Sequence, residues 1–183
     1  MKKIFGILMF LLYIVAILAT HIFIINFLPY PYNHINVIFS VFILLFTIST
    51  HKKMIWLALF VSYFSEMFGS APFGIGTFSL LTSLIAANWL QFNVFSNRSF
   101  YMIFFSAIIG MILYRVIFLI LLAANNYFLN LDSLPYAQMT IDAGWEVLLS
   151  STLSFVIYLM YLRFAGRSKF SSFKKASYYG KVF

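Results

Sequence analysis

Long apolar runs, separated by short polar or proline-containing stretches, fill most of the chain. A helix needs about 20 predominantly apolar residues to cross a hydrocarbon core of about 30 Å, and several of the runs reach that length. The pattern therefore predicts an all-α fold, a polytopic transmembrane helical bundle with six spans. The predicted spans are Ile4–Phe27, Ile35–Thr50, Met54–Phe68, Ile75–Phe95, Phe100–Ala124 and Trp145–Leu162.

The connections between these runs differ in character. His51, Lys52 and Lys53 leave room only for a tight turn, so the second and third spans are predicted to form an antiparallel hairpin. The stretch Leu28–His34 is a firm break, because its prolines lack backbone donors and its tyrosines favour the membrane interface. Asn125–Gly144 is expected to be the longest outer connection. Its Leu134-Pro135 step argues against one continuous helix.

Basic residues are confined to alternate connections, apart from Arg115. Because an excess of Lys and Arg marks cytoplasmic loops, both termini are predicted to be cytoplasmic. We expect a six-span transmembrane domain over residues 1–162 and a basic cytoplasmic tail over 163–183. The tail is expected to lie against anionic lipids, the alternative being a docking peptide for a cytoplasmic partner. The basic residues outside the apolar runs are Lys2, Lys3, Lys52, Lys53, Arg98, Arg163, Arg167, Lys169, Lys174, Lys175 and Lys181.

Composition places the chain among integral membrane proteins, since 63% of its 183 residues are apolar and 9% are charged. The formal charge of +8 follows from the one-sided basic loops, so no nucleic-acid partner is expected. The absence of cysteine excludes disulfides, thiolate metal sites and thiol nucleophiles. The first apolar run is longer than a signal-peptide core and lacks a clear cleavage site, so it is predicted to be a retained span.

Three ionisable residues lie within or at the edge of the apolar runs. Glu66 lies about 18 Å from the inner start of its span and Arg115 about 22 Å from that of its own. Glu146 opens the sixth span from the outer side, which places all three in the outer third of the membrane. An unpaired arginine at mid-span costs about 2.5–3.5 kcal/mol, so Arg115 is predicted to pair with Glu66 or Glu146.

The interpretation favoured for these charges is a structural clamp that joins the third, fifth and sixth spans. A substrate or proton site is one alternative, and an Arg115 side chain that reaches up to the outer interface is another. His21, alone in the first span, is interpreted as a hydrogen-bonded packing residue rather than a ligand.

Small and hydroxylated residues recur at helical spacing in the last three spans. Such residues let helices approach closely in lipid, so a packed bundle is expected rather than a pore. They are Gly76, Ser79, Ser83, Ala86 and Ala87 in the fourth span, Ser106 and Gly110 in the fifth, and Ser150, Ser154 and Tyr158 after Glu146 in the sixth.

Sequence signatures of enzymes are missing. The chain has no His-Glu-x-x-His metal motif, no Gly-x-Ser-x-Gly nucleophile elbow and no phosphate-binding glycine loop. With four acidic residues in total, it offers little material for a carboxylate-pair or metal-dependent mechanism. We therefore predict a protein that is not an enzyme, with no cofactor and no metal site.

One segment carries a resemblance to a known family. Residues 64–74, with the sequence FSEMFGSAPFG, resemble the signature of MreD, the small membrane subunit of the bacterial rod-shape machinery. Glu66, Gly69, Pro72 and Gly74 fall on its acidic, glycine, proline and second glycine positions, with Glu66 where the family more often has aspartate. The chain also resembles the family in length, in its number of spans and in its expected cytoplasmic N-terminus.

The motif has a physical reading. Gly69 is expected to end the third span in a left-handed turn, Pro72 to stiffen the connection, and Gly74 to let the next span start close behind. Glu66 would then accept hydrogen bonds from that turn or pair with Arg115.

The resemblance implies a non-catalytic scaffold for cell elongation and peptidoglycan synthesis in the bacterial cytoplasmic membrane. Its expected partners are the bitopic protein MreC and, through it, the wall-synthesis complex. An alternative from another class is the substrate-binding S-component of an energy-coupling-factor vitamin transporter. Such a protein also has six spans, and it would bind its vitamin in the outer third of the bundle, where Glu66, Arg115 and Glu146 are expected.

Overall fold

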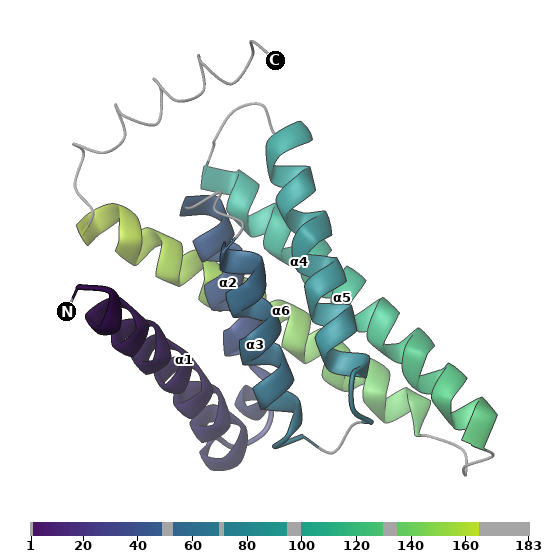
Figure 1. Ribbon diagram of the computed structural model, residues 1–183. Helices are drawn as coiled ribbons and strands as arrows, with labels where there is room; N and C mark the ends of the chain where they lie inside the picture. Colours follow the sequence, from purple (N-terminus) through teal and green to yellow (C-terminus); the bar gives the residue numbers. More distant parts are fainter. Residues whose placement is uncertain (1, 49–52, 70–71, 95–99, 130–134, 165–183) are drawn as a thin grey trace.

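The computed structural model of the protein is a bundle of helices (Figure 1). It describes residues 2–48, 53–69, 72–94, 100–129 and 135–164. Within these residues the chain forms six α-helices and one short 3₁₀ helix, with no strand, so the predicted all-α class is confirmed. The elements are α1 (Lys2–Phe27), η1 (Tyr32–His34), α2 (Val37–Ile48), α3 (Lys53–Glu66), α4 (Ile75–Asn93), α5 (Phe100–Leu129) and α6 (Tyr136–Phe164).

Two of these helices, α5 and α6, are long and apolar enough to cross a membrane. Their 30 and 29 residues correspond to about 45 and 44 Å, more than a hydrocarbon core of about 30 Å requires. Shorter apolar helices cover Leu11–Phe27, Val37–Ile48 and Met54–Glu66.

The predicted boundaries fail in one place. The segment Asn125–Gly144, expected as a connection, is mostly helical, because α5 continues to Leu129 and α6 already begins at Tyr136. No proline or glycine interrupts α5 after Ala124, so the helix continues past the end of its apolar run. Pro135 stands just before α6, where a missing N–H costs nothing, and its carbonyl accepts a bond from the Met139 N–H at 3.1 Å. The predicted tight turn at 51–53 falls largely outside the described residues.

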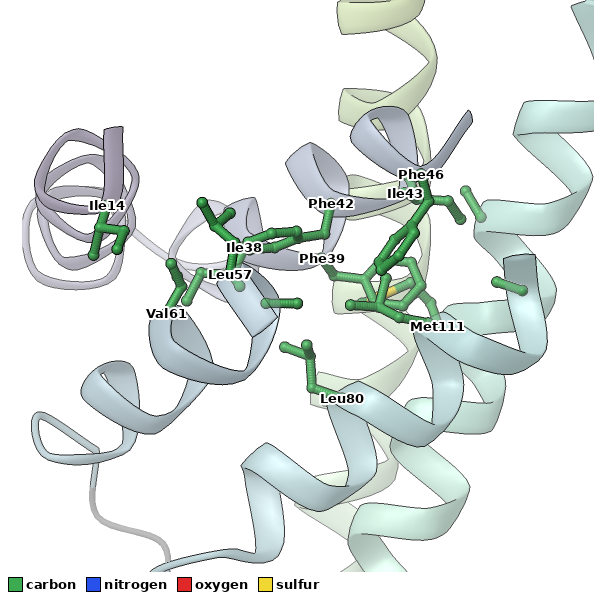
Figure 2. Packing of buried hydrophobic residues seen from close by; sticks show 14 residues of the cluster. Ile14, Ile38, Phe39, Phe42, Ile43, Phe46, Leu57, Val61, Leu80 and Met111 are labelled. Atoms are coloured by element: carbon green, nitrogen blue, oxygen red, sulfur yellow. The ribbon is translucent and has the colours of Figure 1, made fainter. Parts of the chain in front are cut away.

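The centre of the bundle is α2, which contacts all five other α-helices. Its sequence is apolar on every side apart from Ser40 and Thr47, and a helix of that kind is stable only when it is surrounded. Phe39 and Phe42 are completely buried, and they pack among side chains from α3, α4 and α5 (Figure 2). The main core cluster comprises Ile14, Ile38, Phe39, Phe42, Ile43, Phe46, Leu57, Ala58, Val61, Leu80, Leu84, Ala87, Ala107 and Met111.

Helix α1 is the outlying member of the bundle. Figure 1 shows it to one side of α2 and α3, and Ile14 is the one buried apolar residue in its part from Leu11 onward. Helices α4, α5 and α6 run antiparallel to one another in chain order (Figure 1). The start of α1 and the end of α6 lie toward the same end of the bundle. The opposite end, where η1 leads into α2, is called the η1 end below.

Candidate functional site

A buried ion pair joins α5 to α6. The Arg115 guanidinium, through Nη2, contacts the Glu146 carboxylate at Oε2, and the two side chains are 20% and 5% exposed. Arg115 lies in the middle of α5, and Glu146 lies nearly three turns inside α6. The aromatic rings of Tyr114 and Phe118 flank the guanidinium at 5.8 and 5.7 Å, within the range of cation–π attraction. The charge of each partner is thus compensated away from bulk water.

Asn36 connects this pair to α2. Its Nδ2 donates to Glu146 Oε1 at 3.0 Å, and its backbone N–H donates to Ser150 Oγ at 2.8 Å. The Asn36 Oδ1 accepts the Phe39 N–H at 3.0 Å, so the same side chain is the N-cap of α2. Ser40 extends the connection by donating to the Ser150 carbonyl at 2.9 Å. We call Asn36, Arg115, Glu146 and Ser150 the ion-pair cluster.

Of the two carboxylates predicted as partners of Arg115, the structure thus selects Glu146. The expected joining of the third, fifth and sixth spans is wrong in one member, because the cluster ties α2, not α3, to α5 and α6. The role of Asn36 is not predicted from sequence, because an asparagine after a proline-rich break resembles an ordinary loop residue. The signal that could have found it is the pattern of an asparagine directly before an apolar helix, which is typical of an N-cap.

Glu66 instead caps the helix that follows it. Its Oε2 accepts the Gly74 N–H at 3.0 Å and the Thr77 hydroxyl at 2.7 Å, and its Oε1 accepts the Thr77 N–H at 2.7 Å. The first N–H groups of a helix lack partners within it, and a carboxylate there also meets the positive end of the helix dipole. The last residue of α3 therefore fixes the start of α4.

The glycines of this turn have separate tasks. Gly74 precedes α4 with φ 94°, in the left-handed region where a side chain is strained. Gly69 was expected to hold the left-handed turn, and that expectation is wrong, since Gly74 is the residue with positive φ in the described chain. At Gly76 an added Cβ would lie 2.8 Å from Glu66 Oε1, so the missing side chain makes room for the capping carboxylate. The role of Gly76 beside this carboxylate goes beyond the helix packing that its sequence pattern predicts.

A second polar contact lies at the η1 end. His34 Nε2 is 3.6 Å from Asp142 Oδ1, and both side chains are about one-fifth exposed. This distance is longer than a hydrogen bond. The contact is an ion pair only when the His34 imidazole is protonated. Asp142 lies one turn before Glu146 on α6, which puts both carboxylates on the same helix face.

Another buried polar group, also missed from sequence, links α2, α4 and α5 nearer the opposite end. Thr47 Oγ1 donates to Gln91 Oε1 at 3.0 Å, and Gln91 Nε2 donates to Ser106 Oγ at 2.8 Å. Gln91 is 2% exposed, and its position in an otherwise apolar run was the available signal.

The small-residue faces pack as close contacts between helices. Gly110 on α5 lies against Phe39 of α2 and Ala87 of α4, where an added Cβ would come within 2.8 and 3.0 Å of their atoms. Ser79, Ser83, Ser150 and Ser154 are fully buried. His21 departs from expectation, since its buried Nδ1 has no hydrogen-bond partner. The described residues contain no group of three His, Cys, Asp or Glu side chains that could hold a metal ion.

In chemical terms, Arg115 and Glu146 neutralise each other, and the Glu66 carboxylate caps the N-terminus of α4. The ion-pair cluster compensates two charges across three helices, and the Glu66 carboxylate is occupied by three donors. These features define an all-helical protein, in the described residues, with two helices long and apolar enough to cross a membrane and with buried polar clusters between its helices. The chain matches no protein-family model, no curated protein and no solved structure.

Proposed function

We propose that the protein is an MreD-like, non-catalytic membrane scaffold of the bacterial cell-elongation machinery, supporting peptidoglycan synthesis and cell shape. The observation that carries the proposal is the set of hydrogen bonds from Gly74 and Thr77 to the Glu66 carboxylate. The positions that resemble the MreD signature include the capping Glu66 and the left-handed Gly74 of one hydrogen-bonded turn. A motif that sets how two helices join is suited to a protein whose task is to present a fixed shape to partners.

The proposed topology has six spans in the bacterial cytoplasmic membrane, with both termini cytoplasmic. It is supported by the basic residues in alternate connections and by the shared end of the bundle at which α1 begins and α6 ends. Large apolar side chains exposed on every described α-helix except α2, among them Tyr13, Trp56, Trp89, Ile120 and Leu148, suit contact with lipid. The predicted basic tail begins within the last residues of α6, and its part from 165 to 183 lies outside the described residues. Binding of anionic lipids remains its proposed role.

The contacts that Glu66 and Glu146 make with donors of the protein support a scaffold over a catalyst. A catalytic carboxylate must be free to exchange a proton or to contact substrate. Glu66 holds three donors and Glu146 holds Arg115 and Asn36, so both are committed to the fold. The partners proposed for the scaffold are an MreC-like bitopic protein and, through it, the wall-synthesis complex.

The test is depletion of the protein in its native host, with complementation by tagged variants. Glu66→Ala removes the α4 cap, and Ser65→Ala is the matched control, because Ser65 donates only to the carbonyl of Ser62 within its own helix. We expect rounded or swollen cells on depletion, rescue by Ser65→Ala, and weak rescue by Glu66→Ala at equal membrane abundance. The tagged wild type should recover the MreC-like partner. Normal cell shape after depletion would refute the scaffold proposal.

The second candidate remains the S-component of a vitamin transporter. It is favoured by polar side-chain atoms without hydrogen-bond partners near the ion-pair cluster, on Asn33, Arg115 and Asp142. The same purification distinguishes the two functions. Recovery of a transporter ATPase or coupling subunit from cells of normal shape would support the second candidate.

A further inference from the structure

The segment Pro29–Asn36 crosses the η1 end of the bundle between α1 and α2, and we call it the strap. No residue of its 3₁₀ helix is buried, and the rings of Tyr30 and Tyr32 are 54% and 51% exposed. Its fastenings to α6 are polar. His34 faces Asp142 at 3.6 Å, and Asn36 binds Ser150 and Glu146. The strap is therefore held to α6 by polar contacts at and beside the ion-pair cluster.

Unpaired polar atoms gather beneath and within this strap. Asn33 Oδ1, Asp142 Oδ1 and Arg115 Nε are buried and have no hydrogen-bond partner. Each belongs to the strap or lies one contact away from it, through His34 or through Glu146. Among the described residues, three more buried polar atoms have no hydrogen-bond partner: His21 Nδ1, Asn88 Oδ1 and Glu146 Oε2. The last of these contacts the Arg115 guanidinium. A buried polar atom without a partner raises the free energy of the conformation that buries it.

We infer that the strap is a hinged cover that opens locally and gives water access to the Arg115–Glu146 pair while the helices remain packed. Closure gains the bonds of Asn36 to α6 but leaves Asn33 Oδ1 and Arg115 Nε without hydrogen bonds, and Asp142 Oδ1 with only its 3.6 Å contact to His34. In the open state those bonds are lost, and water forms hydrogen bonds with the polar atoms that lack a partner in the closed state. The open and closed states are therefore close in free energy. Asn36 keeps its own bond to the Phe39 N–H, so α2 retains its N-cap when the strap leaves α6. This device is independent of the proposed scaffold function.

The test uses single cysteines, since the chain has none of its own. Ser150 and Ser154 are both fully buried on α6, one turn apart, but only Ser150 bonds to the strap. In protein reconstituted in nanodiscs, we expect Ser150→Cys to react with a charged maleimide at least about tenfold faster than Ser154→Cys, as local opening requires. The His34→Ala background, which removes the contact of the strap with Asp142 and keeps the Asn36 cap of α2, should accelerate Ser150→Cys further and leave Ser154→Cys unchanged.

Hydrogen–deuterium exchange of the unsubstituted protein gives a second readout. Backbone amides of residues 32–36 should exchange faster than those of α2, although the two segments are contiguous. Equal labelling of the two cysteines, whether both are protected or both are reactive, would overturn the inference. So would exchange of the strap as slow as that of α2. Either result would mean that the strap moves only with the whole bundle.

Discussion

At the scale of single residues, Glu146 and Glu66 each depend on a defined set of partners. Glu146 stands at the junction of Arg115, Asn36 and α6, so its charge is tolerated only while those partners remain. Breaking a buried ion pair by removal of one partner costs about 3–5 kcal/mol, because the other charge is left uncompensated. Glu66 has the same dependence on a different partner, the N-terminus of α4.

The Arg115–Glu146 pair predicts a charge-swap result. Arg115→Glu places two carboxylates in contact and should lower the free energy of unfolding by at least about 3 kcal/mol. The double variant Arg115→Glu with Glu146→Arg should recover about half of that loss, since the pair re-forms while the Asn36 bond does not. Thermal unfolding in detergent measures both. Arg163→Glu, an exposed change near the end of α6, is the control, and no recovery in the double variant would count against the pair.

The contact between Gly76 and the Glu66 carboxylate predicts that alanine at position 76 lowers the free energy of unfolding. Gly→Ala within a helix normally gains about 0.5–1 kcal/mol, and Gly144→Ala should do so because an added Cβ there meets nothing within 4 Å. Gly76→Ala should instead cost about 1–3 kcal/mol, because its Cβ would displace the Glu66 carboxylate from the α4 amides. Thermal unfolding of Gly76→Ala and Gly144→Ala, each compared with the unsubstituted protein, measures the two effects. A stabilising Gly76→Ala would mean that the Glu66 cap contributes little.

At the scale of elements, packing of α2 decides the arrangement. A 12-residue helix too short to span a typical membrane by itself lies where all the other α-helices meet. Its close approach to α5 depends on Gly110, which faces Phe39 across the contact. The polar bonds of Ser40 and Thr47 then fix the register of α2 against α6 and α4.

This contact predicts coupled substitutions. Gly110→Ala should lower the free energy of unfolding by about 1–3 kcal/mol through overpacking against the Phe39 ring. Phe39→Leu alone should also destabilise, by leaving a cavity. Together they should cost less than the sum of the two, because the smaller side chain makes room for the added methyl group. Strict additivity in the double-mutant cycle would show that the helices do not meet at this point.

At the scale of the whole molecule, helix lengths are uneven. Helices α5 and α6 exceed the thickness of a hydrocarbon core, whereas α2 and α3, of 12 and 14 residues, correspond to about 18 and 21 Å. Excess length is accommodated by tilt, and Figure 1 shows α5 and α6 running obliquely to α4.

The proposed topology predicts the outcome of reporter fusions. Green fluorescent protein joined to either terminus should fluoresce, since both ends are expected in the cytoplasm. Alkaline phosphatase inserted at residues 130–134, between α5 and α6, should be active because that connection is expected outside. Reversal of Lys52 and Lys53 to glutamate tests the role of basic loops in setting this orientation. An active phosphatase fused after residue 183 would exclude the six-span arrangement.

The positions of the helices could be predicted from sequence, and the partners of the buried charges could not. Apolar runs and proline breaks are local, so most boundaries came within a few residues of those observed, with the failure confined to 125–144. The choice of Glu146 over Glu66 could not be made, because depth along a helix does not tell which way a side chain faces. Asn36 bonds to Glu146 across 110 residues, and no local pattern reports such a contact.

The sequence by itself therefore determined an all-helical chain, the approximate helices and the residues whose burial requires compensation. Those properties follow from local hydrophobicity and from the cost of unpaired charge, both of which depend on residue type. Only the tertiary structure decided that α2 is central, that Glu66 caps α4 and that Arg115 pairs with Glu146. These outcomes depend on how helices rotate and cross, which is set by side-chain packing between residues distant in the chain.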